Sequence, residues 1–158
     1  MNKFLFLVLI FSLGWSSCTT PPQYAVEPNI SFNRFSVDTI NQLSGLVTIY
    51  INFTDGDADL GVSSADTSIN MYIVDTRKED TLLYRIPQIP SNGSSFGIAG
   101  EIEVDVSQVC CIVPGVPTVC SPIPDTYDET TYKILIRDNA GNWSNEVETA
   151  PLKIKCFQ

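Results

Sequence analysis

Glu101-Ile102-Glu103-Val104-Asp105-Val106 (EIEVDV, residues 101–106) is the stretch that decides the fold class, because acidic and apolar residues alternate along its whole length. Successive side chains of a β-strand point to opposite faces, so this period of two predicts a strand with one buried and one solvated face. Outward from this stretch, six further segments are predicted to be strands, most of them from the same alternation: residues 29–37, 47–53, 69–73, 82–86, 132–136 and 152–156.

Short clusters of turn-forming residues separate these segments, and no stretch shows a sustained helical period. Seven short strands punctuated in this way predict an all-β fold, a seven-stranded antiparallel sandwich that resembles the immunoglobulin and fibronectin type III domains. The predicted sandwich occupies residues 28–158, a length that suits one domain with its own core.

The N-terminus has the composition of a secretory signal. Lys3 precedes the apolar run at residues 4–13 (FLFLVLIFSL), and small residues follow this run before Cys18. A transmembrane helix needs about 20 apolar residues, so the run is too short to span a bilayer. We therefore expect residues 1–17 to be a signal peptide and the proline-containing residues 18–27 to form an extended tether.

The sequence Trp15-Ser16-Ser17-Cys18 resembles the lipobox of bacterial lipoproteins, with Trp15 where that motif usually has Leu. The resemblance implies cleavage before Cys18 and attachment of a lipid to Cys18. The chain is thereby similar to small Bacteroidota-type exported lipoproteins, which implies a lipid-anchored location on the outer membrane or cell surface, or at the periplasmic face. A secretory signal without lipidation is the alternative.

The chain is acidic, with 18 Asp and Glu against 9 Lys and Arg and a formal net charge of −9 at pH 7. This balance disfavours nucleic acid and anionic membrane surfaces as partners and favours cations. We expect contact with a membrane through the lipid on Cys18, and a further partner that is an unknown protein or glycan.

Four cysteines remain beyond Cys18, and an even number in an oxidising compartment predicts disulfides. If their stretch is extended, the neighbours Cys110 and Cys111 point to opposite faces, so they are expected to bond to different partners. One bridge is then expected to Cys120 and one to Cys156. The irregular, proline-rich residues 107–128 contain three of the four cysteines, all but Cys156. A zinc site is the competing use, but the chain has no histidine and lacks paired CxxC spacing.

The run Asp55-Gly56-Asp57-Ala58-Asp59-Leu60-Gly61 places three carboxylates at alternate positions of a glycine-containing turn. Calcium takes six to eight oxygen ligands and tolerates irregular geometry, so a tight acidic loop suits it. The three carboxylates would repel one another without a cation. The run resembles the DxDxDG start of calcium loops, with Leu60 where that motif has glycine. Its β surroundings make the calcium loops of cadherin-like sandwiches the closer analogy.

A second segment, residues 138–145 (DNAGNWSN), resembles the turn before the last strand of bacterial immunoglobulin-like repeats. In strand order the acidic run joins the second and third strands and this turn joins the sixth and seventh, and the immunoglobulin arrangement puts both loops at one pole. We therefore expect Asp138 to join the three aspartates, with Asn139 or Asn142 as a further oxygen ligand. The alternative is that these residues only form tight turns.

These features favour a non-enzymatic binding or structural module of the cell envelope with a structural calcium loop. Histidine-dependent nucleophilic triads are excluded because the chain has no histidine. A carboxylate-based hydrolase is the alternative from a different class.

Glycan binding, as in lipoproteins that accompany outer-membrane sugar uptake, is the alternative within the binding class. It requires exposed aromatic rings near one another, and Trp143 is the first candidate to stack on a sugar ring, with Tyr127 or Phe96 beside it. A ring folded back onto the core is the competing reading of Trp143.

Overall fold

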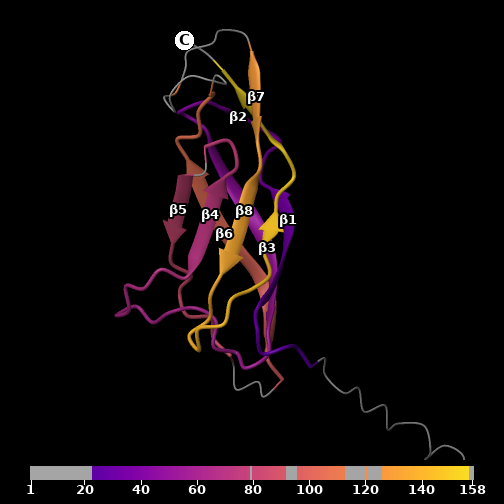
Figure 1. Ribbon diagram of the computed structural model, residues 1–158, viewed down its shortest axis with the longest axis vertical. Coiled ribbons are helices and arrows are strands. Elements are labelled where there is room, and N and C mark those ends of the chain that lie inside the picture. The colour runs from indigo at the N-terminus through magenta and orange to yellow at the C-terminus, as the bar shows by residue number, and fades with distance from the viewer. Residues whose placement is uncertain (1–22, 79, 92–95, 113–119, 121–125, 157–158) are drawn as a thin grey trace, which may run out of the picture.

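The computed structural model describes residues 23–78, 80–91, 96–112, 120 and 126–156, and this part of the chain is all-β, with ten strands and no helix (Figure 1). The predicted signal peptide at residues 1–17 and Cys18 lie outside the described residues. Within the described part, no helix is long and apolar enough to cross a membrane. The strands are β1 (Asn29–Phe35), β2 (Thr39–Asn41), β3 (Leu46–Asp55), β4 (Met71–Asp75), β5 (Asp80–Tyr84), β6 (Ile98–Ser107), β7 (Tyr127–Thr130), β8 (Tyr132–Ile136), β9 (Val147–Glu148) and β10 (Leu152–Lys155).

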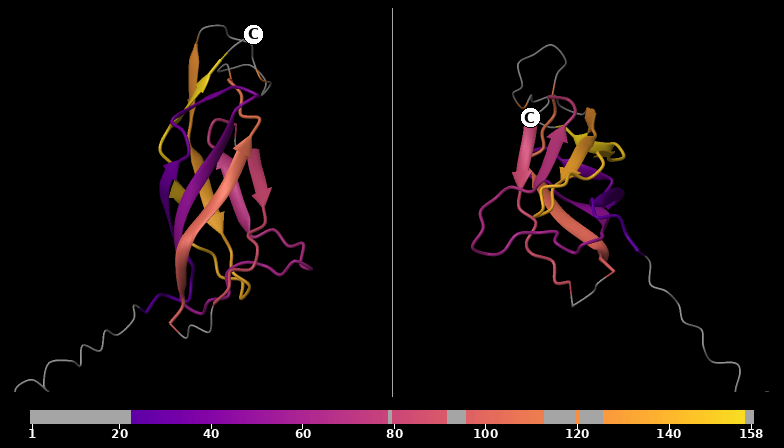
Figure 2. Two further views of the ribbon diagram at one scale, coloured as in Figure 1. Left: turned by 180° about the vertical axis from the view of Figure 1, so that it is seen from behind. Right: turned by 60° about the horizontal axis from the view of Figure 1, so that its bottom comes forward.

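Two larger sheets form two layers, as expected of a β-sandwich. One has the strand order β5-β4-β8-β9 and faces the viewer in Figure 1, whereas the other, β1-β3-β6, is seen from its own side in the left view of Figure 2. A third, smaller sheet, β2-β10-β7, lies at the upper end of the molecule in Figure 1. The longest pairing joins β3 to β6, antiparallel from Leu46 opposite Ser107 to Asp55 opposite Ile98.

The core lies between the two larger sheets and follows the alternation of the sequence. On β6, Ile102, Val104 and Val106 are buried, whereas the acidic residues between them are exposed. Burial of one apolar face in this way is the main favourable term in the folding of a sandwich. The fully buried side chains that meet across the core include Val47, Ile49, Ile51, Ile73, Ile134 and Ile136.

The structure has ten strands where the sequence pattern predicted seven. Each predicted segment contains a strand, and the additions are β2, β7 and β9, of 3, 4 and 2 residues, which are too short for a period of two to register. β7 also begins inside residues 107–128, which were expected to be irregular. In addition, β2 pairs with β10 in parallel, so the fold is not antiparallel throughout.

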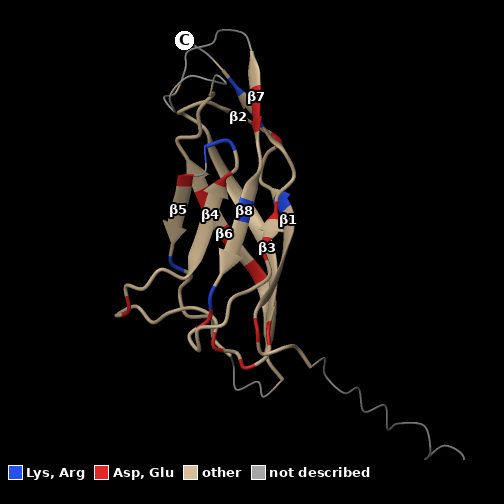
Figure 3. Ribbon diagram, viewed as in Figure 1, with Lys and Arg blue, Asp and Glu red and all other residues tan. Residues whose placement is uncertain are grey.

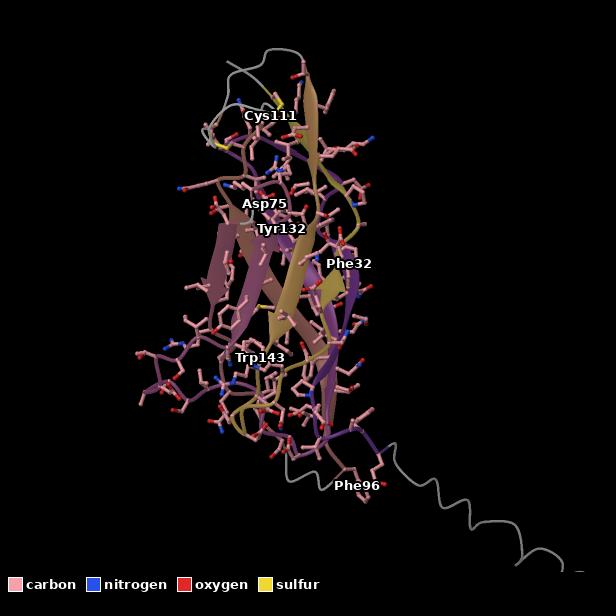
Figure 4. All side chains as sticks on the ribbon, in the orientation of Figure 1. Phe32, Asp75, Phe96, Cys111, Tyr132 and Trp143 are labelled. Carbon is pink, nitrogen blue, oxygen red and sulfur yellow. A yellow bond between two sulfur atoms is a disulfide. The ribbon has the colours of Figure 1, made fainter. Side chains whose placement is uncertain are left out.

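The upper end of the molecule is the cysteine pole, which we define as residues 107–112, 120, 126–128 and 156. Disulfides join Cys110 to Cys120 and Cys111 to Cys156, so the two neighbours do bond to different partners (Figure 4). The lower end is the acidic pole, which we define as residues 55–61 and 137–143.

Arg77 ties the cysteine pole to the sheet beneath it. Its guanidinium donates hydrogen bonds to both carboxylate oxygens of Asp75 (3.0 and 2.7 Å), to the Asp128 carboxylate (2.6 Å) and to the Cys110 carbonyl (3.0 Å). Thr130 also donates to Asp75 (2.8 Å). Burial would raise the pKa of Asp75, but the hydrogen bonds from Arg77 and Thr130 outweigh it, so that pKa lies below its ordinary value.

Candidate metal centre

Four aspartates from two loops meet at the acidic pole, where acidic residues gather at the lower end of the ribbon in Figure 3. Asp55 is the last residue of β3, Asp57 and Asp59 follow in the loop after it, and Asp138 begins the turn after β8. Each contributes a carboxylate oxygen, and these four oxygens lie within 4.8 Å of one another. The structure thus brings Asp138 to the three aspartates of the acidic run.

The loop after β3 curls around the carboxylate of Asp55. Its Oδ2 atom accepts hydrogen bonds from the backbone N–H groups of Asp59 (2.9 Å) and Leu60 (3.0 Å). Two left-handed residues make the curl, Ala58 (φ 62°) and Gly61 (φ 91°), and a Cβ on Gly61 would also collide with the Pro87 carbonyl. The local sequence therefore closes the loop on its own first aspartate.

The turn after β8 is organised by Asp138 in a similar way. Its Oδ1 atom accepts hydrogen bonds from the backbone N–H groups of Gly141 and Asn142, both at 2.7 Å, and its Oδ2 atom accepts one from the Asn142 side chain at 2.8 Å. Such side-chain bonds to the backbone are what Asp and Asn supply in tight turns. Turn formation, the alternative reading of this segment, is therefore one of the roles of Asp138.

Three side chains dock the turn onto the acidic loop and the first strand. The Ala140 N–H donates to Asp59 Oδ2 (2.8 Å), and the Asn139 amide donates to the Gly61 carbonyl (2.8 Å). Asn145 exchanges two hydrogen bonds with the backbone of Ile30, at 2.8 and 2.9 Å. Asn139, predicted as an oxygen ligand, thus directs its amide nitrogen to the acidic loop and holds the two loops together.

Two carboxylate oxygens of the group are left without hydrogen-bond partners among the described residues. They are Oδ1 of Asp55 and Oδ1 of Asp59, and both atoms are buried. Asp55 has an exposed fraction of 0%, and Asp138 one of 6%. Burying a polar atom without a partner costs about 1–3 kcal/mol, and more if it is charged, so both oxygens are in an unfavourable state as they stand.

The pKa values reflect the same conflict. Burial raises the pKa of Asp55 to about 6; the hydrogen bond from Leu60 opposes this rise, and the charges of Asp57 and Asp59 add to it. Burial also raises the pKa of Asp59, and the charges of Asp138 and Asp57 act in the same direction. A nearby positive charge would reverse both shifts, and the arrangement can therefore hold a metal ion.

The predicted ligand-stacking residue, Trp143, lies on the outer face of the sheet at its acidic end (Figure 4). Its exposed fraction is 48%, its ring centroid lies 5.3 Å from that of Tyr72, and the Arg137 guanidinium lies 5.7 Å from the ring. Trp143 is therefore not folded into the core. Tyr127 lies at the cysteine pole on β7, far from this ring.

Tyr72 was missed as a neighbour of Trp143. The signal was present, because Tyr72 lies between the inward-facing Met71 and Ile73 and must face outward on the same strand. Phe96 lies at the tip of the acidic pole in Figure 4, with an exposed fraction of 45%.

No protein-family model matches this chain, and no curated protein matches it.

Proposed function

We propose that this protein is a lipid-anchored module of the cell envelope, with a binding or structural role and no catalytic activity, whose acidic pole binds a structural calcium ion. The carboxylate of Asp55 is the observation that carries the proposal. It is fully buried, its Oδ1 atom has no hydrogen-bond partner among the described residues, and it belongs to a group of four carboxylates within 4.8 Å.

A divalent cation would remove both costs of this arrangement. It compensates the repulsion among the carboxylates, and it gives the Oδ1 atoms of Asp55 and Asp59 a ligand in place of the missing hydrogen bonds. All of the donors are hard oxygens on irregular loops, which favours calcium over magnesium, because magnesium demands near-octahedral geometry. Metals that prefer nitrogen or sulfur ligands have no such donor in this group.

A structural role suits the group better than a catalytic one. Asp55 and Asp138 are buried, and their oxygens already organise the backbone of their own loops. Carboxylates that flank a scissile bond must instead face a substrate from two sides. A carboxylate-based hydrolase is therefore the alternative with less support.

The sandwich is proposed to be a variant of the immunoglobulin and fibronectin type III arrangement. The strand orders β1-β3-β6 and β5-β4-β8-β9 support this, because strands in such folds divide between two sheets in the same alternating way. The extra sheet β2-β10-β7 would then be an addition at the cysteine pole.

The calcium proposal is tested by unfolding the protein in excess calcium and in chelator. When free calcium is about 100 times Kd, we expect the free energy of unfolding to rise by about 2.7 kcal/mol, because the ion binds only the folded state. Asp55→Asn should abolish the rise, whereas Asp38→Asn, an exposed aspartate outside the group, should keep it. An unchanged wild-type midpoint would overturn the calcium site.

The lipid anchor has its own test. Metabolic labelling with a radioactive fatty acid should mark the wild-type protein and leave Cys18→Ala unlabelled, with the variant lost from the membrane fraction. Fractionation and surface proteolysis of the labelled protein then distinguish the cell surface from the periplasmic face. Equal labelling of both proteins would reject Cys18 as the attachment site.

Glycan binding is retained as a second candidate because Trp143 and Tyr72 form an adjoining, partly exposed ring pair beside Arg137. Such rings stack on the apolar faces of sugars. Affinity electrophoresis on a panel of polysaccharides should retard the wild type but not Trp143→Ala, and Tyr127→Ala at the other pole is the matched control. Equal retardation of the wild type and Trp143→Ala would count against this face.

A further inference from the structure

The described N-terminal segment, residues 23–28, lies directly on the acidic loop. A Cβ added to Gly56, which stands between Asp55 and Asp57, would collide with backbone atoms of Tyr24 and Ala25. The φ angle of Gly56 is not in the left-handed region, so the glycine is required by this close approach and not by its own conformation. Backbone of the N-terminal segment therefore packs on backbone of the proposed cation loop.

This contact continues the pairing of β1 with β3. Ile30 lies opposite Phe53 and Asn29 lies opposite Thr54, so the preceding residues run on beside Asp55 and Gly56. Pro28 is buried, whereas the side chains of residues 25–27 are exposed. The start of the described chain accordingly lies at the lower end of the molecule, beside the end of β3 (Figures 1 and 2).

A second segment closes the opposite side of the same peptide. Gly97 has φ 86°, and a Cβ there would collide with the Asp55 carbonyl and approach the Cα of Gly56. The Asp55–Gly56 peptide is thus enclosed between Gly97 and the Tyr24–Ala25 backbone. Because interiors are closely packed, Asp55 cannot shift without moving one of these neighbours.

We infer that residues 23–28 are a positioning element of the cation site: the docked segment holds Asp55 in the four-carboxylate group, and a bound cation in turn holds the segment. The inference rests on the proposed calcium site. Coupling between two binding events is reciprocal, so the factor by which the cation favours docking equals the factor by which docking favours the cation.

This coupling also concerns the membrane. Cys18, the proposed lipid attachment site, precedes Gln23 by only five positions, a span of at most about 17 Å of extended chain. The acidic pole is therefore the pole nearest the anchor, and the cation determines how firmly the domain is held at its tether.

Hydrogen exchange on the full mature chain tests the first half of the coupling. Calcium binding is first measured by calorimetry, and amide exchange at residues 24–27 is then compared in calcium and in chelator. We expect exchange there to slow by about tenfold in calcium, because the Tyr24–Ala25 backbone is then held against Gly56. Unchanged exchange in a protein that binds calcium overturns the inference and leaves the cation site intact.

Variants of the segment test the second half. Ala25→Gly with Val26→Gly removes only exposed side chains and makes the free segment more flexible, so calcium affinity should fall by roughly fivefold to tenfold. Gly56→Ala should also weaken calcium binding. Its control is Gly45→Ala at the β2–β3 turn, where a Cβ collides with the Asn41 backbone far from the carboxylates, and where calcium affinity should be unchanged.

Two failures are distinguishable. A wild-type protein that binds no calcium in calorimetry overturns the cation site and the coupling together. Normal calcium binding by the double glycine variant overturns the coupling alone.

Discussion

Asp55 and Asp75 are each the last residue of a strand and each is buried, with exposed fractions of 0% and 5%. Asp55 belongs to the acidic pole, whereas Asp75 lies at the end of β4 that Arg77 joins to the cysteine pole. Asp75 receives the guanidinium of Arg77, only two residues further along the chain. Asp55 receives only backbone N–H groups and faces other carboxylates. Its pKa is raised to about 6, whereas that of Asp75 is lowered. The chain neutralises Asp75 with its own arginine, whereas Asp55 has no positively charged partner among the described residues and is the carboxylate for which we propose a cation.

The largest expected effect on the free energy of unfolding comes from removing a disulfide at the cysteine pole. Replacing Cys111 and Cys156 by Ala opens a loop with a sequence separation of 45, which should cost about 4 kcal/mol of unfolding free energy. The shorter Cys110–Cys120 loop, with a separation of 10, should cost about 3 kcal/mol. Denaturant unfolding in calcium and in chelator checks both values. A calcium response lost with either bridge would mean that the two poles are not independent.

Arg77→Met should cost about 3 kcal/mol, because it leaves Asp75 buried without its counter-charge. Adding Asp75→Asn should recover a large part of the loss. Thermal and denaturant unfolding of the single and double variants form the cycle that measures the coupling. If calcium rescued Arg77→Met, the contrast between the poles would fail.

Asp55→Asn should act with opposite sign in the two conditions. In chelator at pH 7 it should raise the free energy of unfolding by about 1 kcal/mol, because it removes a buried charge among like charges while an amide oxygen can still accept from Asp59 and Leu60. In calcium it should lower stability relative to wild type. Destabilisation in both conditions would show that repulsion among the carboxylates does not destabilise the metal-free protein.

The pH dependence of the metal-free protein should separate the two aspartates. An unfolded Asp has a pKa of about 3.9, so the raised pKa of Asp55 contributes stability that is complete below about pH 4 and lost as the pH rises through about 6. The lowered pKa of Asp75 contributes stability that is present above about pH 4 and lost as the pH falls below it.

Denaturant midpoints in chelator check this separation. The difference between wild type and Asp55→Asn should change between pH 4 and 7, and the difference between wild type and Asp75→Asn should change only below that window. If both differences changed over the same pH range, the two aspartates would not differ in the direction of their pKa shifts.

The smallest effect is expected at Tyr132, which lies beside Asp75 in Figure 4 and lines a pocket of about 200 Å³ with it. Its hydroxyl is buried and has no hydrogen-bond partner among the described residues. Tyr132→Phe should therefore change stability by less than about 0.5 kcal/mol. A loss above about 1 kcal/mol would mean that the network of Arg77 extends to this hydroxyl.

Residue patterns within single segments predicted the main strands of the fold. The alternation at residues 47–53 and 101–106 located the two longest strands, and strand order within the immunoglobulin arrangement predicted that Asp138 lies near Asp55. The partners of Cys110 and Cys111 followed from their adjacency, although which cysteine takes which partner did not. Arg77 was not singled out, because a charged residue in a turn looks the same whether it faces solvent or a buried carboxylate.

The parallel pairing of β2 with β10 and the packing of Ala25 on Gly56 could not be predicted either. Both join segments far apart in the chain through backbone atoms, and backbone contacts leave little trace in residue type. For the packing of Ala25, glycine at position 56 was such a trace, and it had an equally good explanation as a turn former.

β6 is ten residues long and lies at the edge of its sheet, so its outer backbone groups would readily pair with the same edge of a second copy. The lipid anchor that we propose would crowd molecules in two dimensions and make such encounters frequent. Glu101 of the acidic row is paired with Arg34 (2.9 Å), but Glu103 and Asp105 give two approaching edges like charges. The Tyr84 hydroxyl also donates a hydrogen bond to the Asp105 carbonyl from the other sheet (2.9 Å). The alternation that buries one face of this strand thus also places on its other face the charges that oppose such pairing.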